Sequence, residues 1–346
     1  MNSHMRLVSV IVPSFNSDKY IRDCVRSVQT QSLQDFEIIV VNDGSTDQST
    51  PIVEDMALRD QRIVCLAHPD GKNLGVSKSR KLAIARASGK YIAFLDSDDA
   101  FMPCKLERQC AMLDQNQNAV LCHTAIDVIG DPTLKIQFEE SFNFSRVLTS
   151  YTYHTRPDAL KRNIICNSSV VTRSEPLKKA LVSFPQMFQT EDWINWLRIS
   201  RFGDFIFTPE RLTAYRLHAN SATGRILQDR LAAKYSRLEF LLSCICFAED
   251  EPLRQNAERE LTESVSDLLA IYSQNSPVRE NLLRDAVDSE EGCRFIKSIL
   301  RDELQLLRRE LETAKSSERQ LRNSRSYRLG QTLLKPGKWL QRILDR

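Results

Sequence analysis

Short apolar runs separated by polar turns dominate the first hundred residues. The runs cover 7–13, 36–41, 62–67 and 90–95. Their continuous Val, Ile and Leu content is typical of strands buried in a parallel sheet. Segments in which apolar side chains recur at helical spacing lie between them, at 17–30, 46–60 and 76–87. This alternation predicts an α/β fold with a doubly wound sheet.

The pattern becomes less regular after residue 100. Strands are predicted at 120–129, 168–172, 205–207 and 212–217, and a helix is predicted to begin at Thr190. From Ile226 onward the pattern is helical. We therefore expect three parts, namely a catalytic domain over 1–225, a helical appendage over 226–318 and a tail over 319–346.

The last third of the chain carries two candidate interaction segments. Leucines between Leu300 and Leu321 fit a heptad seam, which predicts a homodimer through 296–325, although an ordinary amphipathic helix fits equally well. The tail 319–346 holds eight Lys or Arg and one acidic residue, with Trp339 and Ile343 on one apolar face. It suits an anionic membrane surface, and the alternative is a basic segment without a partner.

Composition narrows the function classes. The formal net charge of the 346 residues is only +3, so the global charge balance implies no nucleic-acid partner. The nine cysteines form no CxxC pair, which disfavours a zinc site or a disulfide framework and fits a reducing cytoplasm. No apolar run reaches membrane-spanning length. We expect a cytoplasmic protein, docked peripherally on the inner face of the membrane if the tail binds there.

Three carboxylates, Asp96, Asp98 and Asp99, follow the apolar run 90–95 directly. Ligands of open α/β sheets bind at the carboxyl ends of the strands. Clustered carboxylates repel one another unless a positive group lies between them. A divalent metal bound to a phosphate is the simplest such group, and the alternative is a solvated Asp turn.

Two further polar loops, 14–17 and 42–47, follow parallel strands and are expected at the same edge of the sheet. Asp43 could accept hydrogen bonds from an imide or a ribose hydroxyl, and Gly44 allows close backbone approach. The alternative is a plain turn and helix cap. Neither GxGxxG nor GxxxxGK[ST] occurs, so neither a dinucleotide fold nor a P-loop is indicated.

Four motifs within about residues 7–225 resemble, in order and spacing, the family 2 glycosyltransferases of the GT-A fold. They are Pro13–Asn16, Val41–Asp47, Asn73–Arg80 and Phe94–Asp99. The resemblance implies a mixed α/β sheet flanked by helices, and the helical pattern from Ile226 onward adds a helical C-terminal extension to it. It also implies a nucleotide-sugar donor, usually UDP-linked, and Mn²⁺ or Mg²⁺.

The resemblance also implies the roles of single residues. Donor contacts would come from Pro13, Ser14, Asn16, Asp18, Asp43, Gly44, Arg80, Asp96, Ser97 and Arg216. Asp98 would ligate the metal, with Asp96 and His218 beside it, and Arg216 would neutralise the diphosphate. The chain departs from the family pattern after Arg80, where Lys81, Leu82 and Ala83 stand.

The segment from Thr190 to Trp193 resembles the family's Glu-Asp motif. Asp192 would be the base that takes a proton from the acceptor hydroxyl, with Glu191 as the near alternative. The alternative is simple capping by Thr190, and a helix start would lower the pKa of both acids. Trp193 and Trp196 are expected in the core. Asn167 and Ser168 could shape the acceptor pocket.

The function predicted from these residues is inverting transfer of a sugar from a nucleotide-diphosphate donor to a hydroxyl. The acceptor would be a glycan or a lipid-linked molecule in cell-surface polysaccharide synthesis. Two alternatives remain open. A nucleotidyltransferase would release pyrophosphate rather than UDP, and a non-catalytic sugar-nucleotide-binding scaffold would bind donors without turnover.

Overall fold

The computed structural model describes residues 6–141, 150–151, 163–181, 191–228, 237, 240–241, 244 and 251–272. The chain divides into two compact units, Met1–Leu253 and Arg254–Arg346. The domain limits predicted at 225 and 318 stay predictions, and 296–325 and 319–346 lie outside the described residues. Within the described residues, no helix is long and apolar enough to cross a membrane. The helix α10 (Glu251–Tyr272) runs across the boundary between the two units.

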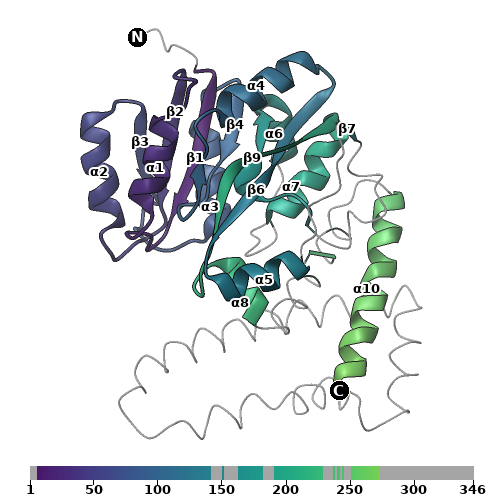
Figure 1. Ribbon diagram of the computed structural model, residues 1–346. Coiled ribbons are helices and arrows are strands. Elements are labelled where there is room, and N and C mark those ends of the chain that lie inside the picture. Colours follow the sequence, from purple (N-terminus) through teal and green to yellow (C-terminus); the bar gives the residue numbers. More distant parts are fainter. Residues whose placement is uncertain are drawn as a thin grey trace, which may run out of the picture. The chain divides into compact units, whose positions relative to one another are not determined.

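The first unit is built on one mixed sheet with nine strands among the described residues (Figure 1). The strands are β1 (Val8–Ser14), β2 (Phe36–Asn42), β3 (Ile63–Ala67), β4 (Tyr91–Phe94), β5 (Ala100–Phe101), β6 (Ala119–Gly130), β7 (Ser150–Tyr151), β8 (Val171–Arg173) and β9 (Asp204–Leu217). Their order is β3-β2-β1-β4-β8-β6-β9-β5, and β7 pairs with β9.

The first four strands are parallel, as their continuous apolar runs predicted. The register pairs Ser14 with Asn42 and Ile11 with Phe94, so β1, β2 and β4 end at one edge of the sheet. The loops after these strands therefore meet there, as expected from the sequence. β8 runs antiparallel to both β4 and β6, which makes the sheet mixed rather than wholly parallel.

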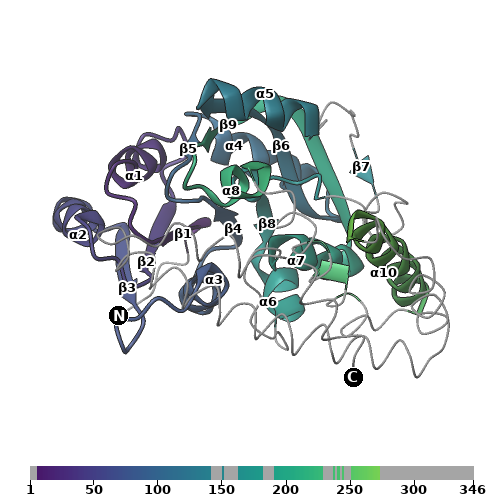
Figure 2. The same cartoon turned by 90° about the horizontal axis from the view of Figure 1, so that it is seen from below.

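Helices cover both faces of this sheet. They are α1 (Ile21–Gln29), α2 (Ser49–Arg59), α3 (Val76–Arg86), α4 (Lys105–Gln115), α5 (Pro132–Ser141), α6 (Ser174–Leu181), α7 (Glu191–Ile199) and α8 (Ala222–Gln228). Figure 2 shows α1 and α4 on one face of the sheet and α3, α6 and α7 on the other. A large apolar cluster that includes Val10, Ile38 and Leu106 fills the space between α1, α4 and the sheet.

Several elements differ from those predicted. The two short strands expected over 205–217 are one strand, β9, because bulges against β6 leave Pro209 out of the register and the pairing resumes at Arg211. Residues 167–169 form a short 3₁₀ turn, η2 (Asn167–Ser169), and only 171–173 pair as a strand. α1 begins at Ile21 after Tyr20, and no side chain caps this end of the helix. The pattern of apolar and polar residues did not predict α4, α5 or α6.

Glu37 lies in β2 near the end of the sheet opposite to the acidic turn, and it is almost fully buried, with 7% of its surface exposed. Its Oε1 accepts hydrogen bonds from the Ser9 hydroxyl at 2.6 Å and from the Ser88 amide at 2.8 Å and hydroxyl at 2.7 Å. Burial alone would raise the pKa of Glu37, but these bonds hold it below its ordinary value. The fold therefore stabilises the charged form of the Glu37 side chain.

A lowered pKa in the folded state makes stability depend on pH. The contribution of Glu37 is complete above its unfolded pKa of about 4.3 and is lost as the pH falls through its lower folded pKa. We expect Glu37→Gln to lower the free energy of unfolding at pH 7 by about 1–3 kcal/mol. The variant should also lose less stability than the wild type on acidification below pH 4.

Urea unfolding at pH 7 and at low pH measures both effects. Glu175→Gln is the control, because the Glu175 side chain is 82% exposed and should change stability little. Equal urea midpoints of Glu37→Gln and the wild type at pH 7 would contradict this account of the Glu37 hydrogen bonds.

Candidate active site

The acidic turn follows β4 at the sheet edge where three parallel strands end. The Asp99 amide donates to the Asp96 carbonyl at 3.0 Å, which closes the turn and sends the three carboxylates in different directions. Asp96 and Asp98 are half-buried, whereas Asp99 is buried. Each carboxylate has its own partners in the fold.

Asp98 faces the end of β9. Its Oδ2 lies 3.0 Å from His218 Nε2, and its carbonyl accepts a hydrogen bond from Arg216 Nε at 2.8 Å. About a quarter of each side chain of the Asp98–His218 pair is exposed. The pair therefore offers an oxygen and a nitrogen ligand to an ion that reaches the turn from solvent.

This pair fits a divalent cation that takes its other ligands from elsewhere. Within the described ranges, no group of three or more His, Cys, Asp or Glu side chains is arranged to hold a metal. Mg²⁺ is usually bound through one or two carboxylates together with water and substrate phosphates. Asp98 and His218 supply such a partial ligand set, and phosphate oxygens of a substrate would complete it.

Asp99, whose role the sequence left open, fastens β9 to the turn. Its Oδ1 accepts a hydrogen bond from the Arg216 amide at 2.7 Å, and only 2% of its surface is exposed. Its Oδ2 has no hydrogen-bond partner among the described residues. Burial, followed by the charges of Asp98 and Asp96, raises the pKa of Asp99. Asp99 therefore sets the position of Arg216 relative to the turn.

A buried guanidinium joins Asp96 to the start of α7. Arg80, in α3, makes ion pairs with Asp96 and with Glu191 at the start of α7. All three side chains come from different elements, and the guanidinium and the Glu191 carboxylate are buried. Arg80 thus lies between two acids of this chain, and its predicted contact with the donor stays a prediction.

The 3₁₀ turn η2 supports Asp96 from the other side. Asn167 Nδ2 donates to Asp96 Oδ1 at 3.2 Å, and the Asp96 amide donates to Ser168 Oγ at 3.0 Å. Beneath them the fully buried Lys105 donates to the Ser169 carbonyl at 2.9 Å. Asn167 and Ser168, which we expected near the acceptor, therefore shape the acidic turn itself.

Asp192 is held beside this network by two hydrogen bonds. Its Oδ2 accepts from Asn163 Nδ2 at 2.9 Å, and its Oδ1 accepts from the Trp193 amide at 2.7 Å. Burial raises the pKa of Asp192, the charge of Asp96 adds to this, and Arg80 and the two hydrogen bonds oppose it. For Asp192 the expectation of a lowered pKa at this helix start is wrong, because burial raises the pKa. Trp193 and Trp196 are buried, as predicted.

Hydrogen bonds tie the loops after β1 and β2 together. Asn16, at φ 48°, accepts from the Thr46 amide at 2.8 Å, and the Asp18 amide donates to Asp47 at 3.0 Å. Ser14 and Ser17 hydroxyls lie 2.9 Å apart. Pro13 lies in β1 opposite Val41, and Ser97 is half-buried in the acidic turn. The structure therefore brings the predicted donor residues of these loops to one edge.

Asp43 and Gly44 bind the loop that precedes α3. The Asp43 carboxylate accepts from the Leu74 amide at 2.7 Å and the Gly75 amide at 3.0 Å, and it is 3% exposed. A Cβ on Gly44 would lie 2.6 Å from the Asn73 amide nitrogen, so glycine is needed for this close approach of the two loops. In this structure Asp43 serves the chain itself, and contact with a base stays a prediction.

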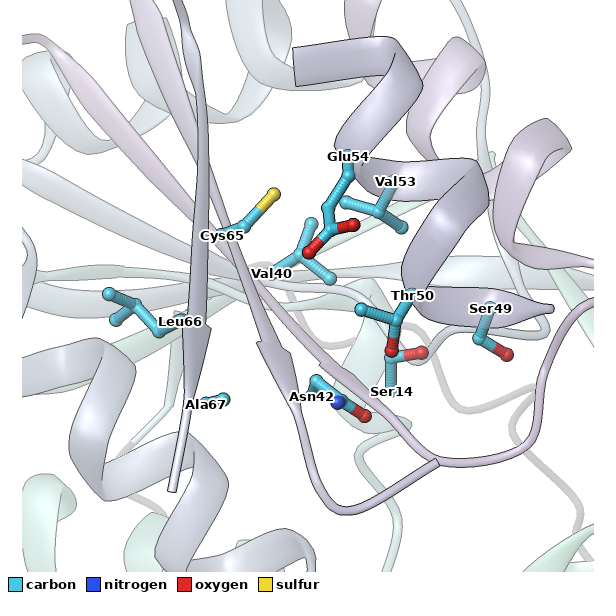
Figure 3. A pocket seen from close by; sticks show the side chains of 10 residues that line it. All are labelled: Ser14, Val40, Asn42, Ser49, Thr50, Val53, Glu54, Cys65, Leu66 and Ala67. Atoms are coloured by element: carbon cyan, nitrogen blue, oxygen red, sulfur yellow. The ribbon is translucent and has the colours of Figure 1, made fainter. Parts of the chain in front are cut away.

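A pocket of about 130 Å³ lies beside these loops, between α2 and the strands β2 and β3 (Figure 3). Ser14, Asn42 and Thr50 line its polar end, and Val40 and Val53 line its apolar part. The Thr50 hydroxyl is buried without a hydrogen-bond partner among the described residues. The pocket can thus receive a small polar group next to the loop after β1.

Two residues of the site were not identified from the sequence. Tyr20 lies against Arg216 and His218, and Asn163 orients Asp192. Neither belongs to a motif with a mechanism, and both act on residues that are at least 29 positions away. The only feature of the sequence that pointed to Asn163 was its place as a polar residue shortly before the 167–169 segment.

Comparison with known proteins identifies the family. The family model for "Glycosyl transferase family 2" matches residues 9–180. The putative teichuronic acid biosynthesis glycosyltransferase TuaG of Bacillus subtilis is 31% identical over 256 residues, which cover 72% of this chain and 96% of that protein. This chain belongs to glycosyltransferase family 2. An uncharacterized glycosyltransferase of Haemophilus influenzae is 29% identical over 63% of this chain and 68% of its own length.

Solved structures agree on the fold of this family 2 member. TarS of S. aureus in complex with UDP aligns with a TM-score of 0.51 and 19% identity, covering 76% of this chain and 72% of that one. The mannosyltransferase PcManGT of Pyrobaculum calidifontis, in complex with GDP-Man and Mn²⁺, aligns with a TM-score of 0.54 and 14% identity, covering 86% of each chain. At these identities the likeness shows the GT-A fold alone. The predicted fold class and the prediction of a glycosyltransferase are confirmed.

Proposed function

We propose that this chain is an inverting glycosyltransferase that moves a sugar from a UDP-linked donor to a hydroxyl of a glycan or lipid-linked acceptor. One observation carries the proposal. The Asp98–His218 pair, which fits a metal, and Asp192, a carboxylate of raised pKa, belong to one cluster that Arg80 joins through Asp96 and Glu191. Such a cluster places groups that could bind the leaving diphosphate and a carboxylate that could act as the base in one site.

The relatives support the class of donor and product. TuaG is named for teichuronic acid biosynthesis, which favours a role in cell-surface polysaccharide synthesis. TarS has been crystallised with UDP and with UDP-GlcNAc, and PcManGT with GDP-Man and Mn²⁺. A UDP-sugar and a divalent metal therefore stand first among the ligands to be tested.

Asp98 and His218 would hold the metal, and Mn²⁺ or Mg²⁺ there would stabilise the negative charge that develops on the leaving diphosphate. Arg216, whose amide and Nε are fixed by Asp99 and the Asp98 carbonyl, adds positive charge on the same side. The loops after β1 and β2 would hold the nucleoside, with the exposed Phe15 ring as a stacking surface for the base.

Asp192 then takes the proton of the acceptor hydroxyl as the acceptor oxygen bonds to the anomeric carbon. The bond from that carbon to the diphosphate oxygen breaks, and its electron pair leaves with UDP. Attack from the face opposite to the leaving group inverts the sugar carbon. Glu191 is held by Arg80, which leaves Asp192 as the acid free to accept a proton.

A panel of UDP-, GDP- and dTDP-sugars with Mn²⁺ tests the proposal by thermal shift. A donor at a hundred times its Kd stabilises the fold by about 2.7 kcal/mol, which is several degrees in Tm. We expect this shift for a UDP-sugar with Mn²⁺ and its loss when EDTA is added. No shift with any donor contradicts the proposal.

The released product separates the two alternatives. Transfer of a sugar releases UDP, whereas a nucleotidyltransferase would release pyrophosphate. A scaffold would bind the donor and release neither product over a panel of acceptors. Membership of family 2 and the cluster at Asp192 favour UDP release.

A further inference from the structure

Tyr20 is an aromatic residue of the active site whose role no motif assigns. It is half-buried and directly precedes α1, where its amide donates to the Ser17 carbonyl at 2.9 Å. Its own carbonyl accepts from the Cys24 amide at 3.0 Å. Both ends of the residue are thus fixed by the backbone, and its ring has a set position at the end of the loop after β1.

Two side chains from the end of β9 pack on the Tyr20 ring. The Arg216 guanidinium carbon lies 5.0 Å from the ring centroid. The His218 ring centroid lies 5.1 Å away, with the two planes inclined by 34°. Arg216 and His218 are two positions apart, so their side chains project to the same side of the extended chain. A single ring therefore contacts both.

These two residues are also the ones that face the turn of Asp98. His218 lies against the Asp98 carboxylate, and Arg216 donates to the Asp98 carbonyl. The Asp98 turn holds Arg216 by its amide and its Nε, which leaves the outer part of the guanidinium to be oriented by something else. An aromatic face attracts a guanidinium and limits its rotamers. The Tyr20 ring is placed to do this.

We propose that Tyr20 is a positioning residue for the diphosphate of the donor. Its ring holds Arg216 and His218 so that both face the position of the phosphates next to Asp98. Because Tyr20 follows the predicted nucleoside loop directly, it links the nucleoside end of the site to its diphosphate end. This inference rests on the proposed function and deepens it, since it names a residue that would favour a nucleoside diphosphate over a nucleoside monophosphate.

Comparing UDP with UMP isolates this role. Isothermal titration of the full chain in Mn²⁺ would give both Kd values for the wild type, Tyr20→Phe and Tyr20→Leu. We expect Tyr20→Leu to weaken UDP roughly tenfold, the size of a partly desolvated cation–π contact, while UMP changes less than about twofold. Tyr20→Phe keeps the ring and should stay within about threefold of the wild type for both ligands.

Phe202→Leu is the matched control, because it removes an aromatic ring that is 47% exposed in the 3₁₀ turn at 200–202. It should leave both Kd values unchanged. If Tyr20→Leu lacks a cooperative thermal transition, Tyr20→Met provides the same comparison with a more adaptable side chain.

Four outcomes overturn the inference. Unchanged UDP affinity in Tyr20→Leu, or an equal loss for UMP and UDP, shows that the ring does not act on the second phosphate. A Tyr20→Phe variant as weak as Tyr20→Leu assigns the effect to the hydroxyl instead. These three results leave the proposed function standing. A wild type that binds neither UDP nor GDP with Mn²⁺ removes the proposed function and the inference together.

Discussion

Asp98→Ala is expected to lower sugar transfer by roughly a thousandfold, because it removes the carboxylate that would hold the metal against the leaving diphosphate. The fold should be unaffected. The Asp98 side chain is about one quarter exposed and contacts His218 across the turn, so its removal opens no apolar cavity. Turnover with Mn²⁺ measures the first effect, and Tm measures the second.

The control for Asp98→Ala is Asp127→Ala. Asp127 is an acid with a side chain that is 40% exposed, and it pairs with Arg211 at 3.6 Å on another part of the sheet. It should keep both Mn²⁺-dependent transfer and Tm. Full Mn²⁺-dependent turnover in Asp98→Ala would remove Asp98 from the metal site, and a large drop in its Tm would give the turn a structural role instead.

Asp192→Asn is expected to keep UDP binding and to lose turnover by roughly 10²–10⁴-fold, the usual contribution of a general base. The amide keeps the shape of the side chain and its oxygen can still accept from Asn163, so the loss isolates proton acceptance. Titration with UDP and Mn²⁺ measures binding, and release of UDP in the presence of acceptor measures turnover. Retained turnover in Asp192→Asn would falsify the assignment of the base.

The raised pKa of Asp192 also predicts a pH dependence. A base works when deprotonated, so kcat/KM should rise with pH through the pKa of Asp192, above the ordinary aspartate value of about 3.9. Asn163→Ala removes a hydrogen bond that stabilises the charged form, so this rise should move to higher pH.

Glu191→Gln provides the contrast for this pH profile. It breaks the ion pair with Arg80 and should lower kcat/KM, yet the rise with pH should remain because Asp192 is still present. Loss of the rise in Glu191→Gln, with its retention in Asp192→Asn, would reverse the two roles.

Much of the fold could be predicted because each parallel strand is a run of apolar residues that are adjacent in the sequence. Strands β1, β2 and β4 are buried along almost their whole length, so each forms a continuous apolar run. The edge strand β3 is partly exposed but is also an apolar run, and the limits of all four differ from the prediction by at most two residues. The helical spacing of apolar residues over 17–30 also predicted α1, whose Ile21, Cys24, Val25 and Val28 are buried. The later strands were harder, because β8 has three residues and β9 contains Pro209 and a bulge.

The candidate site likewise has residues that the sequence predicts and contacts that it does not. Asp96, Asp98 and Asp43 are identifiable because they follow apolar strands directly, and parallel strands end at one edge. The contacts of Arg80 were not predictable, since Glu191 is 111 positions away and meets it only when α3 and α7 pack on the same sheet. The same is true of Tyr20 and His218, which come from opposite ends of the catalytic region.

The sequence by itself determined the strands at the centre of the sheet, the edge at which the polar loops meet and the family resemblance. All three depend on residues that are close together in the chain. Only the tertiary structure decided which partners and which environment each acidic side chain has. Asp96 is joined to Arg80, Asp98 faces His218, Asp99 is buried against β9, and Asp192 has a raised pKa. Charge, burial and hydrogen bonding depend on distant partners, and only folding brings those partners together.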